Sequence, residues 1–488
     1  MATNTTMSLP IPRHRERVRY FATIWAGITL LFGAGTFIAV YAGTGVVNAK
    51  QLNLNGGLGS NGSGVAALQI TATPFPTFPP ENTEVPATVP TDAPTEAPAQ
   101  PAAVGPTATI PPKQDTAFDL GIAVQKNADP NVYKIWVSAV KDDLKLNWVK
   151  SQIVWRDTEK VKGQIDFAEM DVAINQLSEA NVKVMLSITK APDWARDPGA
   201  KIAANQFDGP PANPQDLADF VTAILTRYPG KVHAIEVWNE INLDREWSTN
   251  PQRLDARRYV DLLRVTRDAI RAIDPNIIVI SSALAPTGGN GNPNSAQDDF
   301  VYMDSLIAAG VLQYADCVGT HHNGLNVPPT AADYRNIPER VPPAKYRGPW
   351  SSPHHSWSFR ATLQGYMDKI RAANSTTPLC VTEFGWPSME GLTGQPREGF
   401  GYAFDNTLQD QATFTDEAIT WMQQSGAVRL AFVWNLNYGA QVGWKVAPDD
   451  PVSDNVLWAI LGPEWSKRPV WQKIADRNFR GQPRTAAP

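Results

Sequence analysis

Eight short apolar runs recur between residues 116 and 488, separated by segments with helical periodicity. A strand that is buried on both faces of a parallel sheet has this nearly continuous apolar character. Residues 217–225 and 359–370 instead carry apolar side chains at helical spacing, as expected of helices with one buried face. The strand-like runs are 120–124, 148–155, 182–188, 233–238, 277–282, 316–320, 379–384 and 428–434. Eight alternating repeats predict an α/β fold, a TIM (β/α)8 barrel with right-handed crossovers.

The lengths of the connections indicate which end of this barrel carries the site. Links from a helix to the next strand are short, as at 228–231 and 274–276. Links from a strand to the next helix are long, and they cover about 189–213, 321–356, 384–406 and 435–467. Long loops therefore gather at the carboxyl ends of the strands, where the active sites of TIM barrels lie.

The chain before the barrel divides into three zones. Residues 1–19 end in a basic stretch with four arginines, and residues 20–43 carry no charge. A helix of about 20 apolar residues spans a bilayer, so 20–43 is predicted to be a transmembrane signal anchor that keeps the basic tail in the cytoplasm. The alternative is a cleaved signal peptide, for which Val47-Asn48-Ala49 is an acceptable cleavage site. Both interpretations place the barrel outside the cell.

Residues 44–115 are rich first in Gly, Asn and Ser and then in Pro and Thr. Such a segment has too little apolar surface to fold, and its prolines favour an extended, semi-rigid chain. It is predicted to be a disordered linker that holds the domain of residues 116–488 away from the membrane, with threonines that can carry O-linked sugars.

Composition narrows the function further. Hydrophobic residues make up 43% of the chain and charged residues 19%, with a net charge of -5, so no nucleic-acid partner is expected. The only cysteines are Cys317 and Cys380. Counted by the two-residue period of a strand from the strand ends, Cys317 points into the barrel and Cys380 away from it. Two separate buried thiols are therefore predicted rather than a disulfide.

Two strand ends carry glutamates in similar settings. The fourth run ends in Trp238-Asn239-Glu240, and the seventh ends in Thr382-Glu383-Phe384-Gly385. Hydrolysis of a glycosidic bond requires two carboxyl groups beside one bond, one protonated and one ionised. Glutamates on non-adjacent strands can face each other across the mouth of a barrel. A single glutamate at a strand end is more often a solvated cap or a salt-bridge partner, so the prediction depends on the pair.

These paired motifs resemble glycoside hydrolase clan A, the 4/7 superfamily, with families five and thirty-nine as the nearest relatives. The resemblance implies that Glu240 is the acid/base, that Glu383 is the nucleophile, and that Asn239 binds the sugar 2-hydroxyl. It also implies cleavage of β-linked glycosides with retention, which requires the carboxyl groups to be about 5–5.5 Å apart. The negative charge of Glu383 is expected to raise the pKa of Glu240.

The same resemblance assigns further residues to the substrate site. His321 resembles the strand-six histidine that lines the sugar site, although Asn323 stands where relatives often have a tyrosine that contacts the nucleophile. Arg156, after the second strand, resembles an arginine that steadies the nucleophile, and a structural ion pair is the alternative.

Three tryptophans are candidate platforms for sugar stacking. Trp434 resembles the strand-eight tryptophan under the bound sugar, and Trp194 and Trp386 are weaker candidates for the same role. A plug in the core at the rim of the barrel is the structural alternative.

The remaining polar residues are given structural roles. Glu236 shares the inward face with Glu240 and is expected to pair with Lys150 or Gln152. A metal site could be imagined from the histidines His321, His322, His354 and His355. Histidine pairs without carboxylates or cysteines at ligand spacing are weak indicators, so no metal and no cofactor is predicted.

The sequence as a whole predicts a membrane-anchored extracytoplasmic glycoside hydrolase with a carbohydrate substrate. The alternatives are a carbohydrate-binding or sensing barrel without catalysis, a cell-envelope scaffold, and a transglycosylase that uses the same intermediate. The barrel alone does not choose among them, because one fold hosts many chemistries. The two glutamates favour the enzyme.

Overall fold

The computed structural model describes residues 118–200, 207–337, 353–439, 443–446 and 453–481. The predicted cytoplasmic tail, the membrane helix at 20–43 and the linker at 44–115 lie outside these residues. None of the helices within the described residues combines the length and apolar character that a bilayer span requires.

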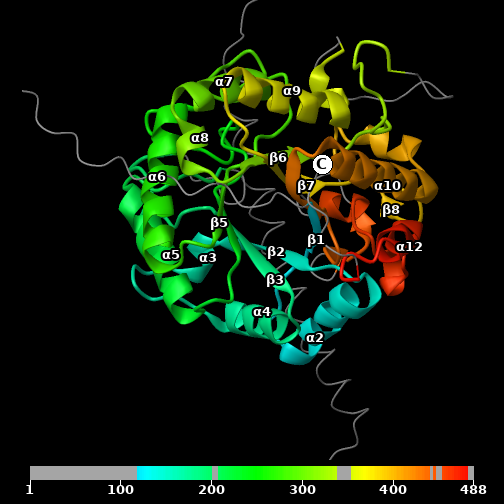
Figure 1. Ribbon diagram of the computed structural model, residues 1–488, viewed down its shortest axis with the longest axis horizontal. Coiled ribbons are helices and arrows are strands. Elements are labelled where there is room, and N and C mark those ends of the chain that lie inside the picture. Colours follow the sequence, from blue (N-terminus) through cyan, green and yellow to red (C-terminus); the bar gives the residue numbers. More distant parts are fainter. Residues whose placement is uncertain (1–117, 201–206, 338–352, 440–442, 447–452, 482–488) are drawn as a thin grey trace, which may run out of the picture. The chain divides into compact units, whose positions relative to one another are not determined.

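Eight parallel strands form the centre of the domain, and helices surround them (Figure 1). The strands are β1 (Asp119–Ala123), β2 (Trp148–Val154), β3 (Lys183–Thr189), β4 (Ala234–Val237), β5 (Ile278–Ser281), β6 (Val318–His322), β7 (Leu379–Phe384) and β9 (Val428–Val433). Each lies within two residues of a predicted run at either end. A separate two-stranded sheet pairs β8 (Thr393–Gly394) with β10 (Lys445–Val446).

The order of the strands is that of a barrel. The sheet runs β5-β4-β3-β2-β1-β9-β7-β6. Its two end strands meet through parallel bridges, which join Ile280 to Cys317 and Leu284 to Thr320. In the middle of this order, β1 pairs with β2 on one side and with β9 on the other. The bridges place β5 against β6. The fold is the predicted α/β barrel of eight parallel strands.

Helices alternate with the strands along the chain. The longer ones are α2 (Pro130–Ser138), α4 (Ala168–Glu179), α5 (Pro214–Arg227), α6 (Ala256–Ile273), α7 (Asp299–Ala308), α9 (Phe359–Ala372), α10 (Leu408–Ser425) and α12 (Pro469–Asp476). Shorter turns are the π-helix η1 (Ala139–Asp143), the helices α3 (Trp155–Thr158) and α8 (Val311–Tyr314), and the 3-10 segments η2 (His355–Trp357), η3 (Gly401–Asp405), η4 (Ser453–Leu457) and η5 (Pro463–Trp465).

The start of α5 shows how the sequence sets these boundaries. Asn213 caps the helix by accepting a hydrogen bond from the backbone N–H of Gln215, and Pro214 occupies the first turn, where its missing N–H costs nothing. The predicted apolar stripe at 217–225 is buried. The helix ends before Gly230, which has a φ of 69° and turns the chain toward β4.

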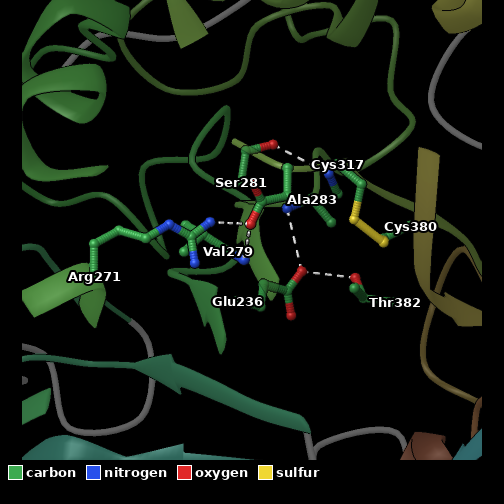
Figure 2. Close-up of a disulfide and its surroundings, with 10 residues drawn as sticks. Glu236, Arg271, Val279, Ser281, Ala283, Cys317, Cys380 and Thr382 are labelled. Atoms are coloured by element: carbon green, nitrogen blue, oxygen red, sulfur yellow. Dashed lines mark hydrogen bonds and ion pairs between the residues drawn. A yellow bond between two sulfur atoms is a disulfide. The ribbon is translucent and has the colours of Figure 1, made fainter. Parts of the chain in front are cut away.

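The barrel interior holds a disulfide between Cys317 and Cys380, with a Cα–Cα distance of 5.7 Å (Figure 2). The prediction of two separate thiols was therefore wrong. The reason is a bulge in β7: Thr320 pairs with Val381, but His321 pairs with Glu383, so Thr382 is an extra residue. Counting back from Glu383 in steps of two misplaces Cys380, which packs in the interior together with Cys317.

Candidate active site

Glu240 and Glu383 both stand at the carboxyl ends of barrel strands. Glu383 is the penultimate residue of β7, and Glu240 follows β4 after Trp238 and Asn239. The backbone beyond β4 is unusual, because Trp238 has a φ of 79° and Glu240 a φ of 42°. Such values are uncommon for residues other than glycine and concentrate at functional sites. The backbone N–H of Glu240 donates to Ala283 O at 2.9 Å, which fixes this turn against the chain beyond β5.

A single imidazole ring connects the two carboxyl groups. His321 Nδ1 lies 3.2 Å from Glu240 Oε1, and His321 Nε2 lies 3.8 Å from Glu383 Oε1. Burial alone would lower the pKa of His321, but the charge of Glu383 and the hydrogen bond to Glu240 outweigh it and raise the pKa. The two glutamates, which lie on different strands, therefore converge at one place in the barrel mouth.

Glu383 is held by donors on both of its oxygens. Lys150 Nζ, from the middle of β2, donates to Oε1 at 2.9 Å, and Asn323 Nδ2 donates to Oε2 at 3.2 Å. Asn323 thus contacts the candidate nucleophile from the position where relatives often have a tyrosine. Donors directed at both oxygens fix the position of the carboxylate and compensate its charge, as suits a nucleophile.

Lys150 also anchors a buried acid below the site. Its Nζ lies 3.7 Å from Glu236 Oε2, which confirms the predicted pairing of Glu236 with an inward cation. Thr382 Oγ1 donates to Glu236 Oε1 at 2.6 Å, and the Ala283 N–H donates to the same oxygen at 3.3 Å. Burial opposes the charge of Lys150, but Glu383 and Glu236 raise its pKa overall. The contact of Lys150 with Glu383 was not predicted from the sequence. A lysine within an otherwise apolar strand was the feature that could have indicated it.

Glu240 has a different electrostatic environment from the one expected. Arg245 Nη2 lies 2.9 Å from Glu240 Oε2, while His321 holds Oε1. Burial opposes ionisation, but the hydrogen bond from His321 and the charge of Arg245 outweigh it and lower the pKa of Glu240 to about 2. The prediction that the pKa of Glu240 is raised was wrong, because it did not include the contacts of Glu240 with His321 and Arg245.

Several buried polar atoms near the two glutamates have no hydrogen-bond partner among the described residues. They include Asn239 Oδ1, His321 Nε2 and Asn323 Oδ1. Buried polar atoms are almost always paired, so three unpaired atoms at one site suggest that a polar ligand completes them. For Asn239 this agrees with the predicted contact to a sugar hydroxyl.

Trp434 lies beside this group. Lys150 Nζ is 5.7 Å from the centre of its ring, and the indole N–H donates to Asn455 Oδ1 at 3.2 Å. Trp434 is buried in a cluster that includes Tyr402 and Trp458. Trp434 is therefore positioned next to the cation that binds Glu383.

The two other predicted tryptophans, Trp386 and Trp194, pack against aromatic side chains. Trp386 is fully buried between Phe359 and Phe414, so it has no face free for a sugar and is a core residue. Trp194 packs edge-on against Trp155, and its indole N–H donates to the backbone of Glu159.

Arg156 lies in the short helix α3, where it forms an ion pair. Its guanidinium pairs with Asp208, a residue of the loop between β3 and α5. A cation that does contact Glu383 is Lys150, six residues earlier in the chain and within β2. The structural ion pair, which was the alternative for Arg156, is the arrangement observed.

The histidines outside the site have partners of their own. His322 Nε2 lies 3.1 Å from Ser356 O, and burial lowers the pKa of His322 to about 4. Among the described residues, Asp298, His354 and His355 form the group that could hold a metal ion. In this structure His354 Nε2 already pairs with Asp298 Oδ2 at 2.9 Å.

The fold and the paired glutamates define a glycoside hydrolase, and the family comparison agrees. Residues 135–438 match the family described as Cellulase (glycosyl hydrolase family 5), which is more than half of the chain. The chain belongs to this family of clan A. No curated protein matches the sequence.

Solved structures with a similar fold share little sequence with the chain. A family 39 glycoside hydrolase from Bacteroides cellulosilyticus WH2 is 17% identical, with a TM-score of 0.48, 74% of this chain covered and 63% of that one. A family 39 β-xylosidase from Caulobacter crescentus is 18% identical (TM-score 0.48, 75% and 72% covered). A family 10 enzyme from Paenibacillus barcinonensis is 16% identical (TM-score 0.46, 76% and 97% covered). The chain thus spans less than two thirds of the length of the Bacteroides enzyme.

Proposed function

We propose that the protein is a retaining glycosidase that cleaves β-O-glycosidic bonds of oligo- or polysaccharides. The observation that carries the proposal is the convergence of Glu240 and Glu383 on the two nitrogens of His321. Two carboxyl groups across one small ring match the need for an acid and a nucleophile on either side of one bond. The donors on Glu383 suit a nucleophile, which must be ionised.

In the first step, a Glu383 oxygen attacks the anomeric carbon as the bond to the leaving oxygen breaks. Glu240 transfers its proton to that oxygen, and a covalent glycosyl-enzyme remains. In the second step, Glu240 takes a proton from water, the water oxygen bonds to the anomeric carbon, and Glu383 is released as a carboxylate. Asn239 and Trp434 would orient the sugar, through its 2-hydroxyl and its ring face.

We also propose that the enzyme acts outside the cytoplasm, tethered through residues 20–43. The uncharged stretch after a basic tail supports the tether. The Cys317–Cys380 disulfide supports an oxidising compartment, because such bonds are rare in the cytosol. The arrangement would hold the barrel away from the membrane on the linker of residues 44–115.

A panel of aryl β-glycosides tests the proposal on the full-length chain purified in detergent. The wild-type protein should release the phenol from at least one β-glycoside. Glu383→Gln should abolish this turnover, whereas Glu169→Gln, at an exposed glutamate of α4 paired with Lys126, should retain it. Full activity of Glu383→Gln would refute the assignment. A folded wild-type protein that binds these sugars without cleaving them would favour the non-catalytic barrel.

A further inference from the structure

Arg245 lies directly on the candidate acid/base. It belongs to the loop after β4, five residues beyond Glu240, and its Nη2 is 2.9 Å from Glu240 Oε2. The arginine side chain is 54% exposed, against 14% for Glu240, so it is more accessible to a ligand than the acid that it contacts. An exposed, planar, five-donor group at a catalytic acid is well placed to meet a ligand.

The positions of the partners show on which side Arg245 lies. Glu240 Oε1 contacts His321, whose other nitrogen is directed toward Glu383. The other oxygen, Oε2, contacts Arg245. In a displacement at the anomeric carbon, the leaving group departs from the face opposite to the nucleophile. Arg245 is thus on the side of Glu240 where the leaving-group part of the substrate would lie.

Glu246 and Asp244 also act on Arg245 through their charges, but the largest charge effect comes from Glu240, which also forms the ion pair. Asp208, held to the same loop by a backbone hydrogen bond with Arg245, already pairs with Arg156 and with Lys190 Nζ at 3.0 Å. Glu246 is partly buried, and burial raises its pKa to about 7. Among the described residues, the acid that forms an ion pair with Arg245 is Glu240.

The resting pair creates a chemical conflict that a ligand can resolve. A general acid must carry a proton, but a guanidinium in contact with its carboxylate favours the ionised form. A carboxylate on the substrate can form two parallel hydrogen bonds with the Arg245 fork. Arg245 would then leave Glu240 Oε2, and Glu240 would take a proton from solvent before donating it to the leaving oxygen.

We propose that Arg245 recognises a carboxylate on the leaving-group portion of the substrate, so that the preferred substrates are β-glycosides with an acidic residue, such as a uronic acid, on that side. This rests on the function proposed above. It makes Arg245 a specificity residue and couples binding of the correct leaving group to protonation of Glu240.

Two matched probes test this on the full-length chain. One is an aryl β-glycoside with 3-carboxyphenol as leaving group, and the other is its methyl ester, with the sugar taken from the panel above. The wild-type enzyme should cleave the carboxylate probe with a kcat/KM about tenfold higher than that for the methyl ester. A tenfold difference corresponds to the free energy of one hydrogen bond to a charged group. Arg245→Met should bring the ratio to about one, and Arg245→Lys should keep part of it. Arg264→Met, at an exposed arginine of α6 paired with Asp261, should keep the wild-type ratio.

The pH dependence of kcat/KM gives a second measurement. A purely structural role of Arg245 would not change it. Glu240 is faced by His321 of β6 and by Arg245 and Glu246 of its own loop, with Lys150 of β2 and Glu383 of β7 beyond His321. Removing the guanidinium leaves an environment that favours the protonated acid more strongly. The alkaline limb of kcat/KM for the ester probe should therefore move to higher pH in Arg245→Met.

The outcomes separate this inference from the proposed function. Cleavage of both probes at equal rates, with an unchanged ratio and alkaline limb in Arg245→Met, would overturn the role of Arg245 and leave the glycosidase intact. No cleavage of either probe, together with a silent aryl panel, would contradict the glycosidase itself and the inference with it.

Discussion

Lys150 Nζ lies 2.9 Å from Glu383 Oε1, and the lysine side chain is completely buried. The nucleophile is therefore paired with a cation from β2, a strand that is not its neighbour in the sheet. Desolvated ion pairs of this kind are costly to break, because removing one partner leaves the other charge without compensation. The contact reaches Glu383 from inside the barrel, where solvent cannot replace it.

Substitution of Lys150 should affect catalysis through its contact with Glu383. We expect Lys150→Met to lower kcat about a hundredfold or more, because the carboxylate loses the buried cation that holds it in place and compensates its charge. Lys467→Met, at an exposed lysine paired with Asp143, serves as the control. A wild-type kcat in a folded Lys150→Met would contradict this role.

Asn239 offers a test at the level of a single hydroxyl group. Its buried Oδ1 has no partner among the described residues, and a sugar 2-hydroxyl can supply one. Asn239→Ala should lower kcat/KM about a hundredfold on an aryl β-glycoside and much less on the matching 2-deoxy glycoside. Equal losses on the two substrates would show that the asparagine supports the fold of the site rather than that hydroxyl.

His321 should make the stability of the domain depend on pH. Its pKa is raised above the ordinary value of about 6.5, so the stabilisation from protonated His321 is fully present below that value and is lost as pH rises through the raised pKa. His321→Gln should therefore destabilise the domain more at about pH 5.5 than at about pH 9. Denaturant unfolding of both proteins measures the difference, and a larger loss at alkaline pH would contradict the bridging role.

The disulfide predicts both a thiol count and a stability change. Cys317 and Cys380 are separated by 63 residues, so the bond restricts a long loop of the unfolded chain. The double substitution to serine should lower the free energy of unfolding by about 2–4 kcal/mol. In the untreated, denatured protein a thiol reagent should find no free cysteine. Two reactive thiols would mean that the bond is not formed.

The eight strands could be predicted from the sequence because each is a short apolar run, the pattern that a buried parallel strand requires. A run such as 379–384 is apolar enough to be recognised without its neighbours, and β7 (Leu379–Phe384) matches it. The bulge at Thr382 could not be predicted in this way. It arises from the pairing of β7 with β6, and β7 also shifts register against β9. The orientation of Cys380 therefore depended on contacts that no local pattern contains.

The residues of the site also differ in whether the sequence alone could identify them. Glu240 and Glu383 could be found because each follows an apolar run in a specific motif. The roles of Lys150 and Arg245 depend on which side chains meet across the barrel mouth. Trp386 was misjudged for a similar reason, since α9 and α10 supply the rings of Phe359 and Phe414 that bury it. A motif identifies the acids, whereas tertiary packing decides what surrounds them.

The central claim is that Glu383 forms a covalent bond to the sugar, and trapping tests it most directly. A 2-deoxy-2-fluoro β-glycoside with a dinitrophenyl leaving group forms such an intermediate quickly and releases it slowly, because the fluorine disfavours both transition states but the leaving group speeds the first. Mass spectrometry of the digested protein should find the sugar on the peptide that contains Glu383, with no label in Glu383→Gln. A label on another residue, or turnover with inversion and no label, would contradict the account.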